Sequence, residues 1–94
     1  MIKIIDNDLR RNARKIGWLE RNRVFDENGR ELGYYDEERN EIFDMSGRRV
    51  AYLDHNLVRS IDGQNLQLDD IQEDVQGGAV SDLCRAAIRL FIGD

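Results

Sequence analysis

The sequence predicts a small, mainly β domain of about four repeated β-hairpins, in a pseudo-symmetric sheet or barrel-like arrangement, followed by one amphipathic C-terminal helix. Two observations lead to this prediction. A unit of 16 to 18 residues recurs between residues 15 and 68, and an apolar stripe of helical period occupies the last residues. A repeat on this scale decides the fold before any single motif does. The predicted organisation is a hairpin domain over 1–68, an acidic, glycine-containing linker over 69–79 and a helix over 80–92.

The repeat consists of three copies of one spacing. Each copy begins with an acidic residue, a basic residue and Asn, and a β-branched residue follows the Asn by two places. Seven places after each Asn comes a glycine: Gly29, Gly47 and Gly63. Asp or Ser three places before a glycine favours a type I turn, with the glycine in the left-handed conformation. Each copy is therefore predicted to be a β-hairpin that bends at its glycine.

The two faces of the hairpins follow from the alternation of side chains along a strand. In the strand that returns after each glycine, aromatic and leucine side chains share one face. The opposite face carries small residues at matching places, namely Gly17, Gly33 and Ala51. Small residues at one repeated position predict a close approach of the strands, near an axis that relates the units.

The N-terminal residues depart from this pattern. Ile2–Ile5 is a β-branched run and predicts a first strand. Residues 12–19 match residues 28–35 position by position, with Ala13 in the place of the glycine, so an irregular leading unit precedes the three clear ones. The segment 6–13 is expected to be an irregular loop or a helical turn.

The C-terminal residues predict one amphipathic helix. Ser81 is a suitable N-cap, and Gly93 is suited to end the helix. The apolar positions follow the i, i+3, i+4 rule and are Val80, Leu83, Cys84, Ala87, Ile88 and Phe91. Burial of each large side chain stabilises by about 1.5–3 kcal/mol, so we expect the helix to be docked on the hairpin sheet or on a second subunit.

The composition limits the class of function. The net charge of −5 argues against a nucleic-acid-binding protein, which needs a basic surface. Residues 1–30 carry +3 (eight basic minus five acidic), and residues 31–94 carry −8 (six minus fourteen). This uneven charge is either balanced by contacts within one fold, or it attracts opposite ends of two copies of the chain. One cysteine is typical of a reducing compartment, and no apolar run is long enough to span a bilayer. We therefore expect a cytoplasmic protein with no membrane contact.

The repeat also resembles a known family. Residues 24–34 carry a hydrophobic-Phe-Asp-x-x-Gly-x-x-hydrophobic-Gly-Tyr phrase, and residues 42–52 repeat it with Ala51 in place of the second glycine. Over residues 15–68 this pattern resembles the bacterial four-fold β-flower domains. The resemblance implies about four hairpins around a pseudo-axis and no particular activity. A second resemblance, at residues 58–63, is to PRC-barrel domains, which are interaction modules.

No catalytic constellation, metal-ligand set or cofactor motif is found in the sequence. The one histidine, His55, takes the place of Arg21 and Arg39 in the other copies, which indicates a basic turn residue and not a general base. Cys84 lies on the apolar stripe and is interpreted as a buried structural thiol. The run Asp26–Gly29 begins like a calcium loop but lacks the EF-hand spacing. We therefore expect no enzymatic activity, no cofactor and no metal.

Aromatic residues recur at one place in successive units, at Trp18, Tyr34 and Tyr52. If their face is open, the rings could stack on a sugar, a base or a proline-rich peptide. The favoured alternative is that the rings pack under the C-terminal helix or against each other.

The only local basic cluster contains Arg10, Arg11 and Arg14. These residues either contact an anion such as phosphate or form a solvated loop that faces the acidic segment 69–74. Together, the observations predict a non-catalytic structural or protein-interaction module that binds a protein partner or self-associates. The alternative is a small-ligand or peptide-binding domain that uses the aromatic row.

Overall fold

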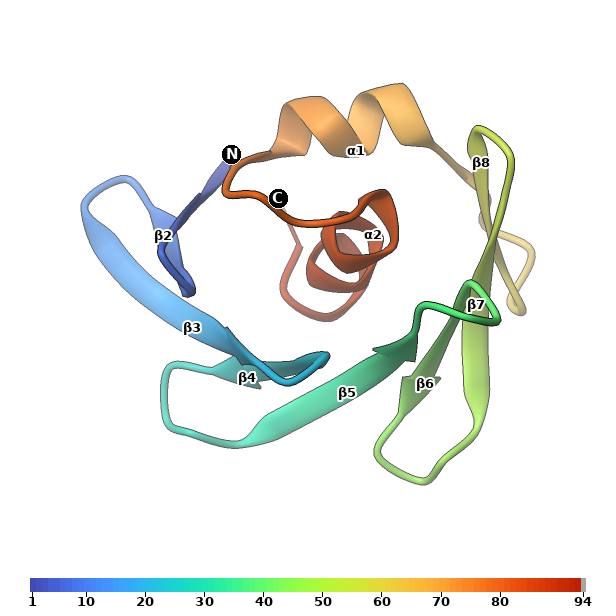
Figure 1. Ribbon diagram of the computed structural model, residues 1–94, viewed down its shortest axis with the longest axis horizontal. Coiled ribbons are helices and arrows are strands. Elements are labelled where there is room, and N and C mark those ends of the chain that lie inside the picture. The colour runs from blue at the N-terminus through green and yellow to red at the C-terminus, as the bar shows by residue number, and fades with distance from the viewer. Residues whose placement is uncertain (94) are drawn as a thin grey trace.

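The computed structural model describes residues 1–93, which form one ten-stranded sheet and two helices (Figure 1). Strands β1 to β9 lie side by side in chain order, and β10 returns to pair in parallel with β1. The sheet curls around helix α2, and helix α1 lies across the opening between its two ends (Figure 1). The hairpins therefore form an open sheet, and the fold is the mainly β architecture that the repeat predicts.

Eight of the strands pair as four antiparallel hairpins: β2–β3, β4–β5, β6–β7 and β8–β9. The strands are β1 (Ile2–Ile5), β2 (Asp8–Arg11), β3 (Arg14–Glu20), β4 (Arg23–Asp26), β5 (Glu31–Asp36), β6 (Glu41–Asp44), β7 (Arg49–Asp54), β8 (Leu57–Ser60), β9 (Leu66–Gln67) and β10 (Val75–Gly77). The helices are α1 (Leu68–Asp74) and α2 (Asp82–Phe91).

The hairpin turns have the same chemistry in successive units. The three repeat glycines share one left-handed conformation, with φ of +85°, +84° and +87° at Gly29, Gly47 and Gly63. The Oδ1 atom of Asp26 accepts the backbone N–H groups of Asn28 (2.9 Å) and Arg30 (3.0 Å). Asp44 accepts the equivalent pair at 2.9 and 3.1 Å. The predicted repeat of glycine turns is confirmed.

A shift of register recurs after the buried residue in the first strand of three of the four hairpins. It lies between Leu9 and Arg10, between Val24 and Phe25, and between Ile42 and Phe43. A bulge of this kind bends the strand and increases its twist. Three bulges at equivalent places explain why the sheet curls around α2 instead of staying flat.

The turns between hairpins reveal a fourth unit. In each unit an Asn carbonyl accepts the N–H of a residue in the returning strand or just after it. The pairs are Asn7 with Leu19 (2.8 Å), Asn22 with Tyr35 (3.0 Å), Asn40 with Leu53 (2.8 Å) and Asn56 with Leu68 (2.9 Å). The expectation of an irregular loop or helical turn over 6–13 is wrong, because β2 lies there. Ala13 can replace the glycine because the left-handed residue in this turn is Asn12, with φ +55°.

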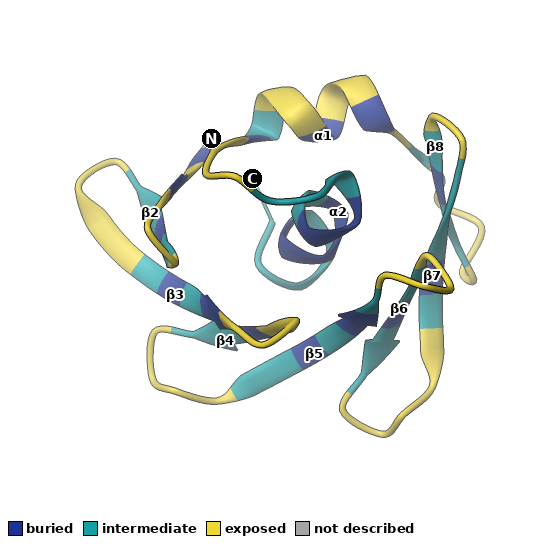
Figure 2. Cartoon of the chain, viewed as in Figure 1, coloured by how far each residue is buried: buried dark blue, intermediate teal, exposed yellow. Residues whose placement is uncertain are grey.

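The core lies between the inner face of the sheet and α2 (Figure 2). The first strand of each hairpin contributes one fully buried side chain, and these are Leu9, Val24, Ile42 and Val58. Helix α2 contributes Leu83, Cys84, Ala86, Ala87 and Ile88. Among residues 1–93 no polar or charged residue is buried, so the interior is held by apolar packing.

The small residues of the repeat lie on this inner face. A Cβ on Gly33 would overlap the ring of Phe91 in α2 and lie 2.6 Å from the carbonyl oxygen of Phe43. A Cβ on Gly17 would overlap the carbonyl oxygen of Phe25. The predicted close approach of strands is present. Residues at the end of α2 also lie close to these two glycines.

The linker predicted over 69–79 is wrong, because this segment contains most of α1 and all of β10. Three apolar residues, spaced by three and four places among the acids, face the core: Leu68, Ile71 and Val75 are 6%, 1% and 0% exposed. The parallel pairing of β10 with β1 joins segments about 70 residues apart. The sequence pattern does not show a partner so distant.

The C-terminal helix is confirmed and begins at its predicted cap. The Ser81 hydroxyl accepts the N–H of Cys84 (3.1 Å) and donates to Oε1 of Glu37 (2.9 Å). The helix packs on α1 and on strands β4, β5, β6 and β10 of its own chain. None of the helices in residues 1–93 has the length and apolar character needed to cross a membrane.

Candidate functional site

The predicted aromatic row lies on the outer face of the hairpins, away from α2. Trp18 stacks on Phe25, with ring centroids 5.3 Å apart and an interplanar angle of 10°. Tyr34 stacks in the same way on Phe43, at 5.2 Å and 13°. In both cases the ring at the predicted place holds one hairpin to the next. In the following unit Arg59 takes the place of the phenylalanine, opposite Tyr52.

This position corrects the favoured interpretation of the row. The rings do not lie under the C-terminal helix, because the small residues on the inner face leave room only for the helix itself. They pack against phenylalanines of neighbouring strands and not against each other. Trp18, Tyr34 and Tyr52 are each partly exposed, so solvent reaches this face.

Cross-strand ion pairs form a second repeated feature of the outer face. The first member of each pair directly follows the Asn of its unit. The second member lies two places after the repeat glycine, or after Ala13 in the first unit. The pairs are Asp8–Lys15 (3.1 Å), Arg23–Glu31 (3.4 Å) and Glu41–Arg49 (3.0 Å). The charges have the same order in hairpins β2–β3 and β6–β7 and the opposite order in β4–β5. We call β4–β5 the reversed hairpin.

The order of the charges decides whether a cation covers the ring of the same hairpin. Lys15 Nζ lies 5.0 Å from the centroid of the Trp18 ring, and Arg49 Cζ lies 4.7 Å from that of Tyr52. In the reversed hairpin the equivalent residue is Glu31. Among residues 1–93, therefore, no cation lies over the ring of Tyr34.

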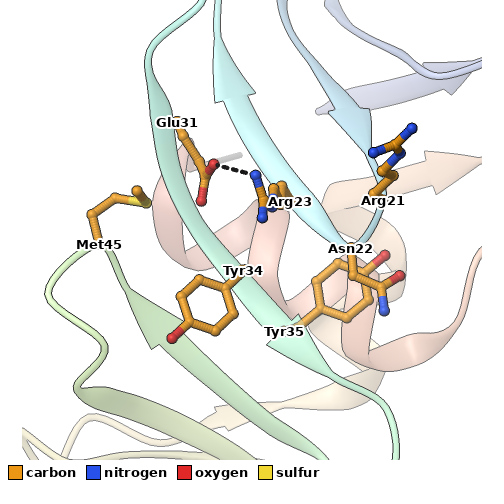
Figure 3. A pocket seen from close by; sticks show the side chains of 7 residues that line it. All are labelled: Arg21, Asn22, Arg23, Glu31, Tyr34, Tyr35 and Met45. Atoms are coloured by element: carbon orange, nitrogen blue, oxygen red, sulfur yellow. Dashed lines mark hydrogen bonds and ion pairs between the residues drawn. The ribbon is translucent and has the colours of Figure 1, made fainter.

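A groove of about 430 Å³ lies beside this ring (Figure 3). We call it the Tyr34 groove, and its lining residues are Arg21, Asn22, Arg23, Glu31, Tyr34, Tyr35 and Met45. Tyr34 and Met45 lie toward one end, Arg21 and Asn22 toward the other, and the Arg23–Glu31 pair lies between them (Figure 3). Met45 is 54% exposed, so the groove has an apolar end that is open to solvent.

The predicted basic cluster has partners within the hairpins. Arg14 pairs with Glu27 of the next hairpin at 2.7 Å, and Arg10 pairs with Asp8 of its own hairpin at 3.5 Å. These ion pairs are made with residues of the hairpins and not with segment 69–74. The third member, Arg11, lies at the end of β2. No anion is therefore needed to balance the charges of Arg10 and Arg14.

The titratable groups of the interior are held in their protonated forms. Burial raises the pKa of the Cys84 thiol and of the Tyr35 hydroxyl. A thiol in this state is a poor nucleophile, which agrees with the interpretation of Cys84 as structural. His55 lies in the turn between β7 and β8 with φ +54°, almost fully exposed, and its Nδ1 is 2.9 Å from Asp54 Oδ1. His55 is thus the turn residue that the repeat indicates.

The arrangement of the possible metal-ligating side chains can be stated for the described residues. Within residues 1–93, no three His, Cys, Asp or Glu side chains are placed to hold a metal ion together.

Sequence reasoning found Tyr34 but missed Glu31, Arg23 and Met45. The exchange of charge between positions 23 and 31 is visible when the repeat copies are aligned. Whether this exchange leaves the Tyr34 ring without a cation depends on the register of the strands. Only the bulged pairing of β4 with β5 shows which side chain can reach the ring.

One comparison with known proteins succeeds. The sequence model of a family described as "4-fold beta flower protein" matches residues 22–67. This segment begins at the Asn of the reversed hairpin and ends with β9. No curated protein and no solved structure gives a significant match. The match confirms the resemblance that the repeat shows.

Proposed function

From the match of residues 22–67 to the 4-fold beta flower family, we propose that the chain is a non-catalytic protein-interaction module that makes its contacts with the outer face of its hairpins. The family description states an architecture, and the chain is accordingly a small structural domain. The partner we propose is another protein or a second copy of the chain, and not nucleic acid, since the net charge is −5.

One observation supports this proposal most strongly: the reactive groups of the described residues already have structural roles. The carboxylates of Asp26 and Asp44 bind turn N–H groups, and other acids form cross-strand pairs. The interior groups with shifted pKa, Tyr35 and Cys84, are protonated and buried. Perturbed titratable groups are frequent at active sites, and the lowered pKa of a partly exposed group such as Asp44 comes here from hydrogen bonds within a turn.

The remaining parts of the proposal concern location and self-association. A cytoplasmic location is supported by the single cysteine, which is free and buried. Self-association is supported by the uneven charge, since residues 1–30 carry +3 and residues 31–94 carry −8. Sedimentation velocity at low and high salt tests it, because attraction between exposed charges weakens as salt is added.

Site-specific photocrosslinking in the native cell tests the main proposal. A photoreactive benzoylphenylalanine replaces Met45 or Leu57 on the outer face, or Gln72 on α1 as a matched exposed control. We expect an adduct of constant mass at an outer position and none at position 72. Equal labelling at all three positions, or no adduct at either outer position, would show that the outer face is not an interaction surface.

A second candidate is a small-ligand-binding domain, and the Tyr34 groove is the observation that favours it. The row as a whole is less available, since Lys15 and Arg49 cover Trp18 and Tyr52. A nuclear magnetic resonance (NMR) titration with small sugars and nucleosides tests this candidate. Saturable shifts confined to residues of the groove would support it, and unchanged spectra would exclude it for these two ligand classes.

A further inference from the structure

Two hairpins define a three-part arrangement that the reversed hairpin leaves incomplete. In β2–β3, the ring of Trp18 carries Lys15, whose amine pairs with Asp8. In β6–β7, a tyrosine ring carries Arg49, whose guanidinium pairs with Glu41. Each arrangement is a ring, a cation over it and a carboxylate beside the cation. The reversed hairpin has the ring and a carboxylate, but no cation over the ring.

The carboxylate of the reversed hairpin has a free oxygen. Glu31 Oε1 accepts from Arg23 Nη1 at 3.4 Å, whereas Oε2 has no hydrogen-bond partner among residues 1–93. The Glu31 side chain is 16% exposed, and the Arg23 side chain is 57% exposed. Because Glu31 is the less solvated partner, its charge is less screened than that of the arginine.

From this comparison we propose that the Tyr34 groove receives an arginine or lysine side chain of a partner protein. The cation lies over the Tyr34 ring, where Lys15 and Arg49 lie in the other hairpins, and donates a hydrogen bond to Glu31 Oε2. Its alkyl stem packs on Met45 at the open end of the groove. The inference rests on the proposed interaction function and names the chemistry of one contact.

The arginines of the groove favour an anion, and two observations outweigh them. Arg23 is neutralised by Glu31, and Arg21 lies in an exposed turn toward the far end of the groove (Figure 3). The charge of an exposed group such as Arg21 is screened by salt. The chain as a whole carries −5, which attracts a basic partner and repels an acidic one.

A titration of the full-length ¹⁵N-labelled protein tests the proposal. The probe is the blocked tripeptide acetyl-Gly-Arg-Gly-amide, and the comparison probe is acetyl-Gly-Glu-Gly-amide. We expect saturable shifts at Tyr34, Glu31 and Met45 with the arginine peptide, and none at these residues with the glutamate peptide. Shifts at these residues with the glutamate peptide alone would overturn the proposal in favour of an anion site.

A double substitution gives the sharpest control. Arg23→Glu with Glu31→Arg keeps the ion pair and restores the charge order of the other hairpins, so the new arginine covers Tyr34. We expect binding of the arginine peptide to fall about tenfold, with the thermal midpoint little changed. Equal binding by the native and exchanged proteins would overturn the proposal.

The reciprocal exchange makes a second site. Glu41→Arg with Arg49→Glu reverses hairpin β6–β7 and uncovers Tyr52. We expect the arginine peptide to shift Tyr52 in this variant and not in the native protein. No new shift at Tyr52 would contradict the rule that charge order opens the ring. Photocrosslinking at Leu57 is independent of the Tyr34 groove, so this inference can fail while the proposed interaction function stands.

Discussion

The inner and outer faces of the same hairpins differ in how strictly they repeat. On the inner face the first strand of every unit places one fully buried aliphatic residue in the core, at Leu9, Val24, Ile42 and Val58. On the outer face the ring, its stacking partner and the order of charges all vary. The inner residues share one close-packed core, where a change of even one methylene group alters stability. An exposed ion pair contributes about 0–1 kcal/mol in either order, so the outer face can change without loss of the fold.

The largest expected effect is on the inner face. Ile42→Ala removes a fully buried side chain and should lower the free energy of unfolding by about 2–5 kcal/mol, because it leaves a cavity beside α2. Chemical denaturation measures the difference. Met45→Ala is the outer control, with an expected change within about 0.5 kcal/mol. Similar losses for the two variants would contradict the division between the faces.

Substitution of a glycine on the inner face and of a glycine in an exposed turn should lower stability by different amounts. Gly33→Ala places a Cβ against Phe91 and the Phe43 carbonyl, so we expect a loss of about 1–3 kcal/mol and shifted NMR signals in α2. At Gly63 no atom lies within 4 Å, and only the φ of +87° restricts the residue. Because Asn tolerates this conformation better than most residues, Gly63→Asn should cost only about 1 kcal/mol. Equal losses would show that the lack of space around Gly33 does not set the cost of its substitution.

Acid should weaken the outer turns before it affects the apolar core. Hydrogen bonds from Ser46 and from backbone N–H groups hold the pKa of Asp44 below its ordinary value of 3.8. A folded-state pKa below the unfolded value adds stability above about pH 4, and this stability is lost as the pH falls through the folded pKa. Calorimetry should therefore show a midpoint that falls below about pH 4. The fall should be smaller in Asp44→Asn, and an identical fall in both proteins would contradict this assignment.

The smallest expected effect on stability comes from the charge exchange. Arg23→Glu with Glu31→Arg should change the free energy of unfolding by less than about 1 kcal/mol, since the exposed pair is kept with its order reversed. Denaturation at low and high salt measures the change. A larger loss would mean that folding needs this order of the charges. The outer face would then be less free to vary than we infer.

Part of the candidate site was accessible from the sequence. The repeat placed Tyr34 in a row of equivalent rings, and the structure keeps that equivalence. The repeat could not show that the aromatic row faces outward. The alternation of side chains along a strand defines two faces but does not say which face is buried. The small inner residues, Gly33 among them, decide this by admitting α2. The role of Glu31 followed only from the bulged register.

The sequence by itself determined the hairpin turns, the number of units and the capped helix, because turn glycines, Asx hydrogen bonds and the helical period act over a few residues. Only the tertiary structure decided that the sheet stays open, that α1 lies across the opening and that β10 pairs with β1. These contacts join segments far apart in the chain, and their stability comes from shared burial around α2, to which no local pattern points.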